Sequence, residues 1–180
     1  MMRLGWFFTT YFAILGAGAS VVIHPAPRLI WNATASTPVG LYRLQSARSL
    51  HVGDVIVIRP PADIATMLAR GGYLPLGVPL LKPVAALPGQ LVCRIGVVVS
   101  VDGKPLGDAL ARDHRGRPLP VWQGCRRVLP GKIFVMNPAV PTSLDGRYFG
   151  VLPVAAVLGR AQPLWLAPSP IPPNPKQKRG

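Results

Sequence analysis

The sequence contains no glutamate, and its six acidic residues are all aspartates. This absence excludes the His-Glu-x-x-His helices of zinc proteases and the EF-hand loops of calcium-binding proteins, because both need a glutamate at a fixed position. Chemistry with paired carboxylates would have to use aspartates alone, and none of the six form an evident pair. We therefore expect no metal ion and no cofactor.

Histidine is also scarce, and its three copies are poorly placed to serve as a catalytic base. His24 adjoins a long apolar segment, His51 opens a Val-Gly-Asp turn, and His114 lies in a charged loop. A serine nucleophile needs a base within hydrogen-bond reach. The Gly-x-Ser-x-Gly elbow of many serine hydrolases is absent as well. A serine enzyme built on this chain would need a base other than histidine.

Charge is nearly missing from the stretch between Arg70 and Arg94, where Lys82 is the one charged residue. A lysine in such apolar surroundings is either a solvated loop residue or a buried amine. A buried amine loses its proton far more readily than an exposed one, and a neutral lysine is a general base. Lys82 is therefore the first candidate for catalysis.

Ser36 has the most unusual setting of the seven serines. Pro38 and Gly40 follow it and force an irregular backbone, while small residues on both sides leave its hydroxyl accessible. Local sequence alone is compatible with an ordinary Ser/Thr turn. The presence of Lys82 favours a catalytic role, since serine with lysine is the available nucleophile and base.

The net charge is +14, and it comes mainly from scattered arginines. Nucleic-acid binding usually gathers such residues on one face or interleaves them with aromatic side chains, whereas here most of them stand at turns and strand ends. We expect no nucleic-acid partner. Basic charge near an anionic lipid surface suits a membrane-associated protein better.

Charge is absent altogether from Leu4 to Ile23, a segment of 20 residues. As a helix it would reach about 30 Å, the thickness of a bilayer core. The alternative is a cleaved signal peptide with its cleavage site in the small residues 17–19. We favour a retained anchor because the apolar run continues without a turn signal. Either way, we expect the rest of the chain to be exported.

Only two cysteines are present, Cys93 and Cys125, which are 32 residues apart. In an oxidising compartment they could form a disulfide that closes the arm between them. The alternative is two buried free thiols. Neither cysteine is flanked like a nucleophile.

The pattern of the remaining chain predicts a mainly β body. Short runs of β-branched residues alternate with Pro, Gly and Asp turns, and Ala62 to Arg70 is the one plausible helix. Leu91 to Val101 is expected to be one long strand, and Asp108 to Pro120 a surface loop. The predicted organisation is an anchor over 1–23, a body over 24–162, and a proline-rich basic tail over 163–180 that does not pack.

A third segment, Thr142 to Gly150, places an acid, a base and a second serine within five positions. Such a dense polar cluster beside apolar strands indicates a buried hydrogen-bond network. The plainer interpretation is a hairpin loop with an ion pair between Asp145 and Arg147.

The segments around Ser36, Lys82 and Ser143, in this order, resemble the type I signal peptidase family of serine/lysine proteases. Ser36-Thr37-Pro38 is similar to the nucleophile motif of that family. Lys82, followed by Pro88-Gly89, is similar to its general-base motif. Ser143 to Gly150 resembles its last motif, Ser-x-Asp-Ser-Arg-Tyr-x-Gly.

Finer features are similar to the conjugative-transfer signal peptidases, which mature the pilin of plasmid transfer systems. These features are the run from Thr37 to Arg43 and the sequence Asp145-Gly146-Arg147. The resemblance extends from about Ala33 to Gly159. Two departures are Asn137-Pro138, where Gly-Asp is usual, and Gln90, where the family has an aspartate, so roles that rest on those carboxylates do not carry over.

The resemblance implies a role for each matching residue. Ser36 would be the nucleophile and Lys82 the base that takes its proton. The Thr34 hydroxyl and the Ser36 amide would form the oxyanion hole. Ser143 would orient the Lys82 amine, while Asp145 and Arg147 would hold that loop together.

The resemblance also implies a mainly antiparallel β fold with one N-terminal transmembrane helix, held in the bacterial inner membrane with the catalytic domain in the periplasm. A groove would bind the substrate as an added strand, and small pockets would select small residues. The expected substrate is a pilin precursor or another exported preprotein, with conjugative transfer channel proteins as further partners. Some members of that branch are thought to join the ends of the pilin, and the sequence leaves this activity open. The alternatives are a general signal peptidase and a non-catalytic anchored assembly factor of the transfer channel.

Overall fold

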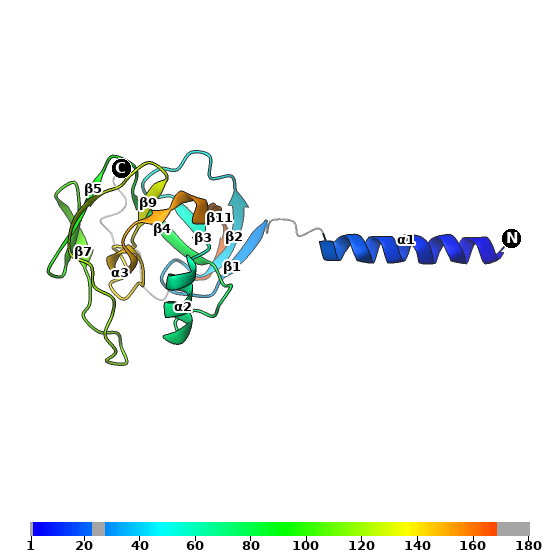
Figure 1. The fold of residues 1–180 in the computed structure, drawn as a ribbon, viewed down its shortest axis with the longest axis horizontal. Helices are drawn as coiled ribbons and strands as arrows, with labels where there is room; N and C mark the ends of the chain where they lie inside the picture. The colour runs from blue at the N-terminus through cyan, green and yellow to red at the C-terminus, as the bar shows by residue number, and fades with distance from the viewer. Residues whose placement is uncertain (1, 23–27, 169–180) are drawn as a thin grey trace.

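The computed structural model of this chain describes residues 2–22 and 28–168. The segment predicted to be an anchor forms helix α1, Met2–Val22, which stands apart from the β body (Figure 1). None of the helices in these two ranges is long and apolar enough to cross a membrane, so the predicted transmembrane helix is not confirmed. Ile23, the last residue of the predicted span, lies outside the described residues.

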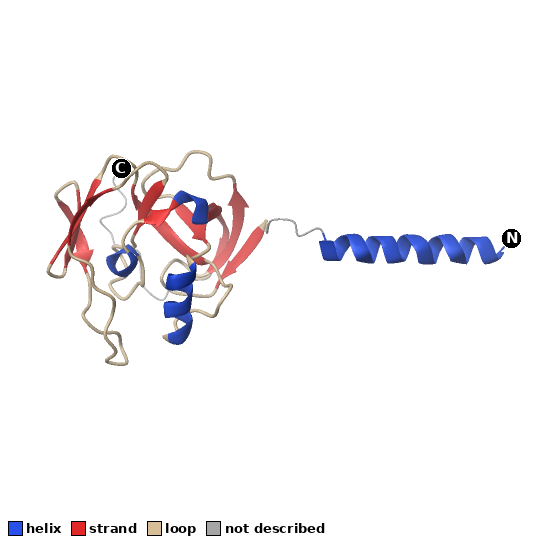
Figure 2. Ribbon diagram, in the orientation of Figure 1, coloured by secondary structure: helices blue, strands red, loops and turns tan. Residues whose placement is uncertain are grey.

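The body is built mainly of antiparallel strands, as the sequence predicts (Figure 2). Its larger sheet has seven strands in the order β1-β2-β11-β3-β4-β9-β10. Their bounds, in that order, are Leu29–Asn32, Gly40–Gln45, Val157–Leu166, Val55–Ile58, Leu80–Ala86, Lys132–Val135 and Leu152–Pro153. Strand β4 lies well inside this sheet, between β3 and β9, and it carries Lys82.

The smaller sheet forms an arm at one end of the body and has four strands in the order β7-β6-β5-β8. Their bounds, in that order, are Lys104–Asp108, Val98–Val101, Leu91–Ile95 and Gly124–Arg127. The prediction of one strand from Leu91 to Val101 is wrong, because the chain turns back between β5 and β6. Gly96 makes this turn with φ of 61°, a backbone conformation that glycine adopts without strain.

The one helix expected in the body is confirmed as α2, Ala62–Arg70. Pro61 precedes it, where a proline costs no helical hydrogen bond, and Gly71 ends it. Two short elements were not expected: α3, Gly146–Phe149, and the 3₁₀ turn Val154–Ala156. Helix α3 falls in the segment for which a hairpin loop was one interpretation.

The core lies on both faces of the larger sheet and under the arm. One cluster packs α2 onto the sheet through Leu68 and Ile56, together with Leu80 and Val84 of β4. Another joins the arm to β9 and α3. Consecutive residues of a strand point to opposite faces, so Lys82 shares the face of Leu80 and Val84. The lysine is thus placed in the apolar layer under α2.

The chain after Pro163 is not all an unpacked tail. Strand β11 continues to Leu166 and pairs with β2, with a register shift between Pro163 and Trp165. Trp165 also stacks on Trp31 of β1, with ring centroids 5.7 Å apart. The prediction of an unpacked tail from Pro163 onward is therefore wrong for residues 163–166. A strand tolerates a proline where its pairing with the neighbouring strand is irregular. Residues 169–180 lie outside the described residues.

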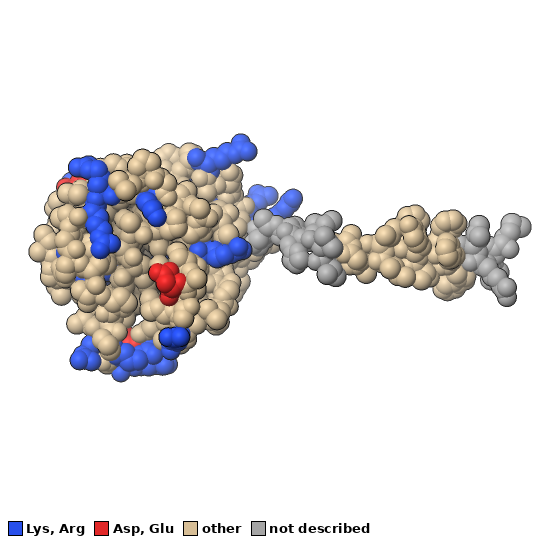
Figure 3. All heavy atoms as spheres, viewed as in Figure 1, with Lys and Arg blue, Asp and Glu red and all other residues tan. Residues whose placement is uncertain are grey.

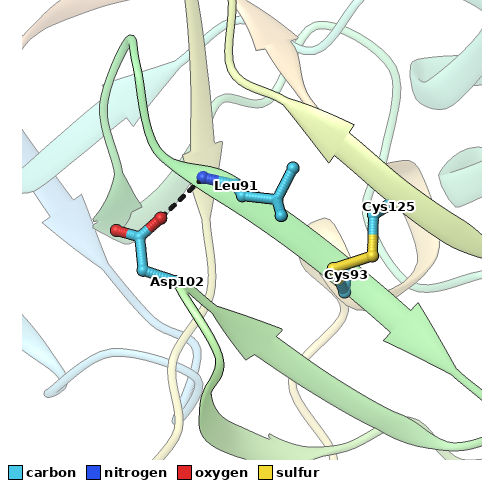
Figure 4. The surroundings of a disulfide bond; sticks show 4 residues. All are labelled: Leu91, Cys93, Asp102 and Cys125. Carbon is cyan, nitrogen blue, oxygen red and sulfur yellow. Dashed lines mark hydrogen bonds between the residues drawn. A yellow bond between two sulfur atoms is a disulfide. The ribbon is translucent and has the colours of Figure 1, made fainter.

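The two cysteines form a disulfide between neighbouring strands of the arm (Figure 4). Cys93 of β5 stands directly opposite Cys125 of β8 in the antiparallel register. The interpretation as two free thiols is therefore wrong in this structure. The bond closes a long excursion of the chain, which includes the loop from Asp108 to Pro120.

Removing this disulfide should lower the free energy of unfolding by about 3 to 4 kcal/mol, the value for a loop of this length in the chain-entropy model. The variant Cys93→Ala/Cys125→Ala, compared with wild type by urea titration, measures the loss. A reducing agent should destabilise wild type and leave the double variant unchanged. If the unfolded, unreduced protein exposed two thiols to an alkylating reagent, the bond would not exist in solution.

Candidate active site

The backbone around Ser36 is held in shape by Asn32 at the end of β1. The Asn32 amide nitrogen donates hydrogen bonds to the carbonyls of Thr34, Thr37 and Pro38, at 2.9, 2.9 and 3.0 Å. Its oxygen accepts from the Thr34 backbone N–H at 3.2 Å. Asn32 is buried, so these bonds satisfy an amide that would otherwise be costly to bury. One side chain thus fixes the irregular turn that presents Ser36.

The Ser36 hydroxyl lies 3.3 Å from the Thr34 hydroxyl. The Thr34 hydroxyl donates its proton to the Asn32 oxygen at 2.9 Å. Because that proton is already used, the bond between the two hydroxyls must run from Ser36 to Thr34. The Ser36 proton therefore points toward Thr34 in this conformation.

Lys82 is almost fully buried, with only 2% of its surface exposed. Its amine donates a hydrogen bond of 2.9 Å to the Ser143 hydroxyl. Burial lowers the pKa of Lys82 to about 8, against a partly compensating effect of the nearby Asp145 carboxylate. The sequence prediction of a buried amine with a depressed pKa agrees with this environment. The depression is smaller than the one needed to make half of the amines neutral at pH 7.

Asp145 and Arg147 form a fully buried ion pair, with 3.2 Å between Arg147 Nε and Asp145 Oδ1. The Asp145 carboxylate also accepts hydrogen bonds from the backbone N–H groups of Asn137 and Arg147, at 3.0 and 3.2 Å. Burial raises the pKa of the Asp145 carboxyl, although Arg147 opposes this effect. The dense polar cluster predicted from the sequence is thus a buried network.

The Arg147 guanidinium ties this loop to its surroundings. It donates to the carbonyls of Pro141 and Val140 at 2.7 and 3.0 Å, and also to the carbonyl of Asn137. These carbonyls belong to the segment that leads into Ser143. Arg147 therefore fixes the position of the serine that holds the Lys82 amine.

Ser36, Lys82 and Ser143 line one cavity of about 540 Å³. One wall is the segment from β1 through Ser36, another is the stretch 140–144, and the third comes from α2 and the chain that follows it. In the part of the chain that the structure describes, no hydrogen bond joins Ser36 to Lys82. The structure thus brings the predicted nucleophile and base to one cavity without a direct bond between them. No three potential metal ligands come together among the described residues.

Sequence reasoning missed two residues of this site, Asn32 and Asn137. The Asn137 amide donates to the Ser36 carbonyl at 2.7 Å, and its backbone N–H binds Asp145, so it links the Ser36 turn to the buried ion pair. In the sequence, Asn137 stands out only as a departure from the Gly-Asp pattern. For Asn32, a signal was present in the sequence. An asparagine that follows a short apolar, strand-like run favours an Asx turn.

Comparison with known proteins shows the family of this chain. The family model described as signal peptidase, peptidase S26, matches residues 1–166. A probable conjugal transfer protein TraF of Sinorhizobium fredii is 41% identical over 73% of this chain and 73% of its own length. A conjugal transfer protein TraF of Agrobacterium fabrum is 34% identical over 74% of this chain and 80% of its own length.

A solved signal peptidase I from Enterococcus faecalis is 20% identical and covers 64% of this chain and 98% of its own, with a TM-score of 0.39. A score of this size carries no weight for the overall fold. The family match, by contrast, covers most of the chain. The chain belongs to the signal peptidase family, and its relatives include conjugal transfer proteins.

Proposed function

We propose that this chain is a serine endopeptidase that cuts an exported precursor with Ser36 as nucleophile and Lys82 as general base. The observation that supports it best is the buried Lys82 amine, held by Ser143 in the cavity that Ser36 also lines. A buried lysine costs stability, and a chain that serves only as scaffold would gain nothing from it. Catalysis is a reason to keep one.

The reaction begins when Lys82 takes the proton of Ser36 while the Ser36 oxygen bonds to the carbonyl carbon of the scissile peptide. Collapse of the tetrahedral intermediate breaks the peptide C–N bond, and Lys82 returns the proton to the leaving amine. Lys82 then takes a proton from water as the water oxygen bonds to the acyl carbon, and it returns this proton to the Ser36 oxygen when the ester bond breaks. The first step needs the Ser36 hydroxyl to rotate from Thr34 toward Lys82.

The oxyanion would be stabilised by the Ser36 backbone N–H and the Thr34 hydroxyl. At present that hydroxyl donates to Asn32, so it must turn toward the substrate to act. The move is small, because a hydroxyl hydrogen rotates about a single bond. A donor of this kind contributes roughly 3 kcal/mol to the transition state.

The substrate we propose is a pilin precursor of a conjugative transfer system, with the body on the periplasmic side of the inner membrane. The names of the two relatives described above, which refer to conjugal transfer, support this choice over a general signal peptidase. Two segments frame the cavity with backbone that could pair with an extended peptide, the β1 end and the stretch before β4. Joining of the pilin ends would use the same acyl-enzyme, with an amine in place of water.

The test is to express the chain together with the pilin precursor encoded nearest to its gene. Wild type should shorten the precursor, and Ser36→Ala should leave it whole, as mass spectrometry of the product would show. An acylating agent directed at serine nucleophiles should add its mass to Ser36 in wild type and not in Lys82→Met. Equal labelling of both proteins, or none, would indicate a non-catalytic assembly factor instead. Cleavage of many unrelated preproteins would indicate a general signal peptidase.

A further inference from the structure

Tyr73 forms part of the cavity wall, and residues that do not line the cavity fix its position. It follows α2, and its ring belongs to two of the core clusters as a partly buried member. Its backbone N–H donates to the Leu68 carbonyl at 2.9 Å. Gly71 lets the ring come this close, since a Cβ there would lie 2.1 Å from the Tyr73 ring. The absence of a side chain at Gly71 therefore makes room for the Tyr73 ring.

The Tyr73 ring is fixed by two charged residues of the loop between β7 and β8. Its hydroxyl donates to the Asp113 carboxylate at 2.5 Å. The Arg117 guanidinium lies over the ring, 4.7 Å from its centroid, and forms an ion pair of 2.6 Å with Asp113. Arg117 also donates to the Gly71 carbonyl at 2.7 Å. Tyr73, Asp113 and Arg117 therefore form one closed set of contacts, which we name the wall clamp.

The wall clamp is built more firmly than an exposed ion pair. The Asp113 side chain is only 5% exposed, and it also accepts backbone hydrogen bonds from Arg115 and Arg117, at 2.8 and 2.9 Å. Burial works to raise the pKa of the Asp113 carboxyl, but hydrogen bonds from Tyr73 and Arg117 hold it well below its ordinary value. The carboxylate thus stays charged at any pH at which the enzyme would be assayed.

The side chains of the other arginines in this region do not take part in the wall clamp. Figure 3 shows basic side chains gathered at the lower end of the body, where Figure 1 places the β7–β8 loop. Arg112 and Arg115 are exposed, whereas Arg117 is partly buried against Tyr73. The loop therefore holds Tyr73 with one acidic residue, Asp113, and one basic residue, Arg117. Asp113 is one of only six acidic residues in the chain.

We propose that Tyr73 determines which side chain of the substrate the cavity accepts, and that Asp113 and Arg117 are positioning residues that fix it. This inference rests on the proposed function, since it assigns the cavity beside Ser36 to the substrate. The neighbouring wall residues, Leu68, Leu74 and Leu80, are apolar. The ring limits the size of an apolar substrate residue, and the loop of the arm sets that limit without touching the substrate.

The experiment uses peptides that span the cleavage site of the pilin precursor, with each position in turn occupied by Ala, Val, Leu or Phe. Wild type should prefer a small residue at the position that meets Tyr73. Tyr73→Ala should raise kcat/KM for Leu relative to Ala at that one position by at least about tenfold, the lower end of the discrimination that one methylene group gives. At the other positions the ratios should not change.

Three further variants separate specificity from folding. Tyr73→Phe removes the hydroxyl that binds Asp113, and Asp113→Asn removes the charge that pairs with Arg117. Both keep the ring and the side-chain shape, so they should relax the same ratio by about two- to threefold. In both variants the change should fall on kcat/KM for the larger residue rather than equally on all peptides. The matched control is His114→Ala, which changes the exposed neighbour of Asp113 and should alter nothing. Thermal unfolding of each variant shows that the protein is folded.

The possible failures can be told apart. If wild type cleaves none of the peptides, the proposed function fails, and the specificity role fails with it. If wild type cleaves but Tyr73→Ala keeps the wild-type ratio at every position, the proposed function stands and the role of Tyr73 is wrong. A loss of kcat for all peptides alike in folded Asp113→Asn would show that the clamp supports the whole site and does not select the substrate.

Discussion

Lys82→Arg should cleave the precursor at least roughly a thousandfold more slowly than wild type, although it keeps the positive charge and most of the side-chain volume. An arginine stays protonated in proteins, so it cannot take the proton of Ser36. Loss of a general base that also activates the nucleophile accounts for an effect of this size. The measurement is single-turnover cleavage, with thermal unfolding to show that the variant is folded.

Wild-type activity should rise with pH, because the pKa of Lys82 is about 8 and the neutral amine is the working form. With that value, about one amine in ten is neutral at pH 7 and about nine in ten at pH 9, so the rate should rise roughly tenfold. Substitution of each histidine in turn should leave this profile intact. A bell centred on pH 6.5, or loss of activity in His51→Ala or His114→Ala alone, would point to a different base.

The same pKa makes stability depend on pH, and the sign can be worked out. The unfolded lysine keeps its proton up to about 10.5, and the folded one loses it near 8. Between these values the unfolded state binds more protons, so stability rises with pH. The gain is on the order of 3 kcal/mol and should disappear in Lys82→Met. Urea titration at pH 7 and pH 10 measures both.

The burial of Lys82 could be predicted from sequence because its neighbours on both sides are apolar. On a strand, residues two apart share a face, so Leu80 and Val84 carry the lysine into the core with them. Such information is local, and local patterns are what a sequence displays. The helix from Ala62 to Arg70 was found for the same reason, since Pro61 and Gly71 mark its ends.

Contacts between segments that are distant in the sequence could not be predicted from local patterns. Asn137 binds the carbonyl of Ser36, which is 101 residues away, and nothing in either segment announces this bond. The turn at Gly96 was missed because β-branched residues continue on both sides of it, and only the pairing of β5 with β6 reveals it. The wall clamp depends in the same way on a 40-residue separation between Tyr73 and Asp113.

The ion pair between Asp145 and Arg147 should be the most costly polar contact to remove from the site. Both side chains are almost fully buried, and Arg147 also satisfies the carbonyls of Pro141 and Val140. Arg147→Met would leave the Asp145 carboxylate buried without its cation. Breaking a buried pair from one side costs about 3 to 5 kcal/mol. We expect a loss of stability of this size in urea titration.

The choice of controls can show that the lost charge, rather than lost volume, causes this effect. Arg147→Lys keeps a cation but loses the planar fork that reaches several carbonyls at once, so it should recover only part of the stability. The double variant Asp145→Asn/Arg147→Met removes both charges and should lose less than the sum of the two single losses. Strict additivity would show that the two residues act independently.

Arg147→Met should also change the acid–base behaviour of Lys82, which a purely structural role would not do. The guanidinium lowers the pKa of Lys82 by repulsion, while the Asp145 carboxylate raises it. Without Arg147, the amine should hold its proton to higher pH, and the rise of activity should move to higher pH as well. Asp145→Asn should move it to lower pH. Profiles of single-turnover cleavage between pH 6 and 10 measure both shifts, and shifts in one common direction would contradict this assignment of charges.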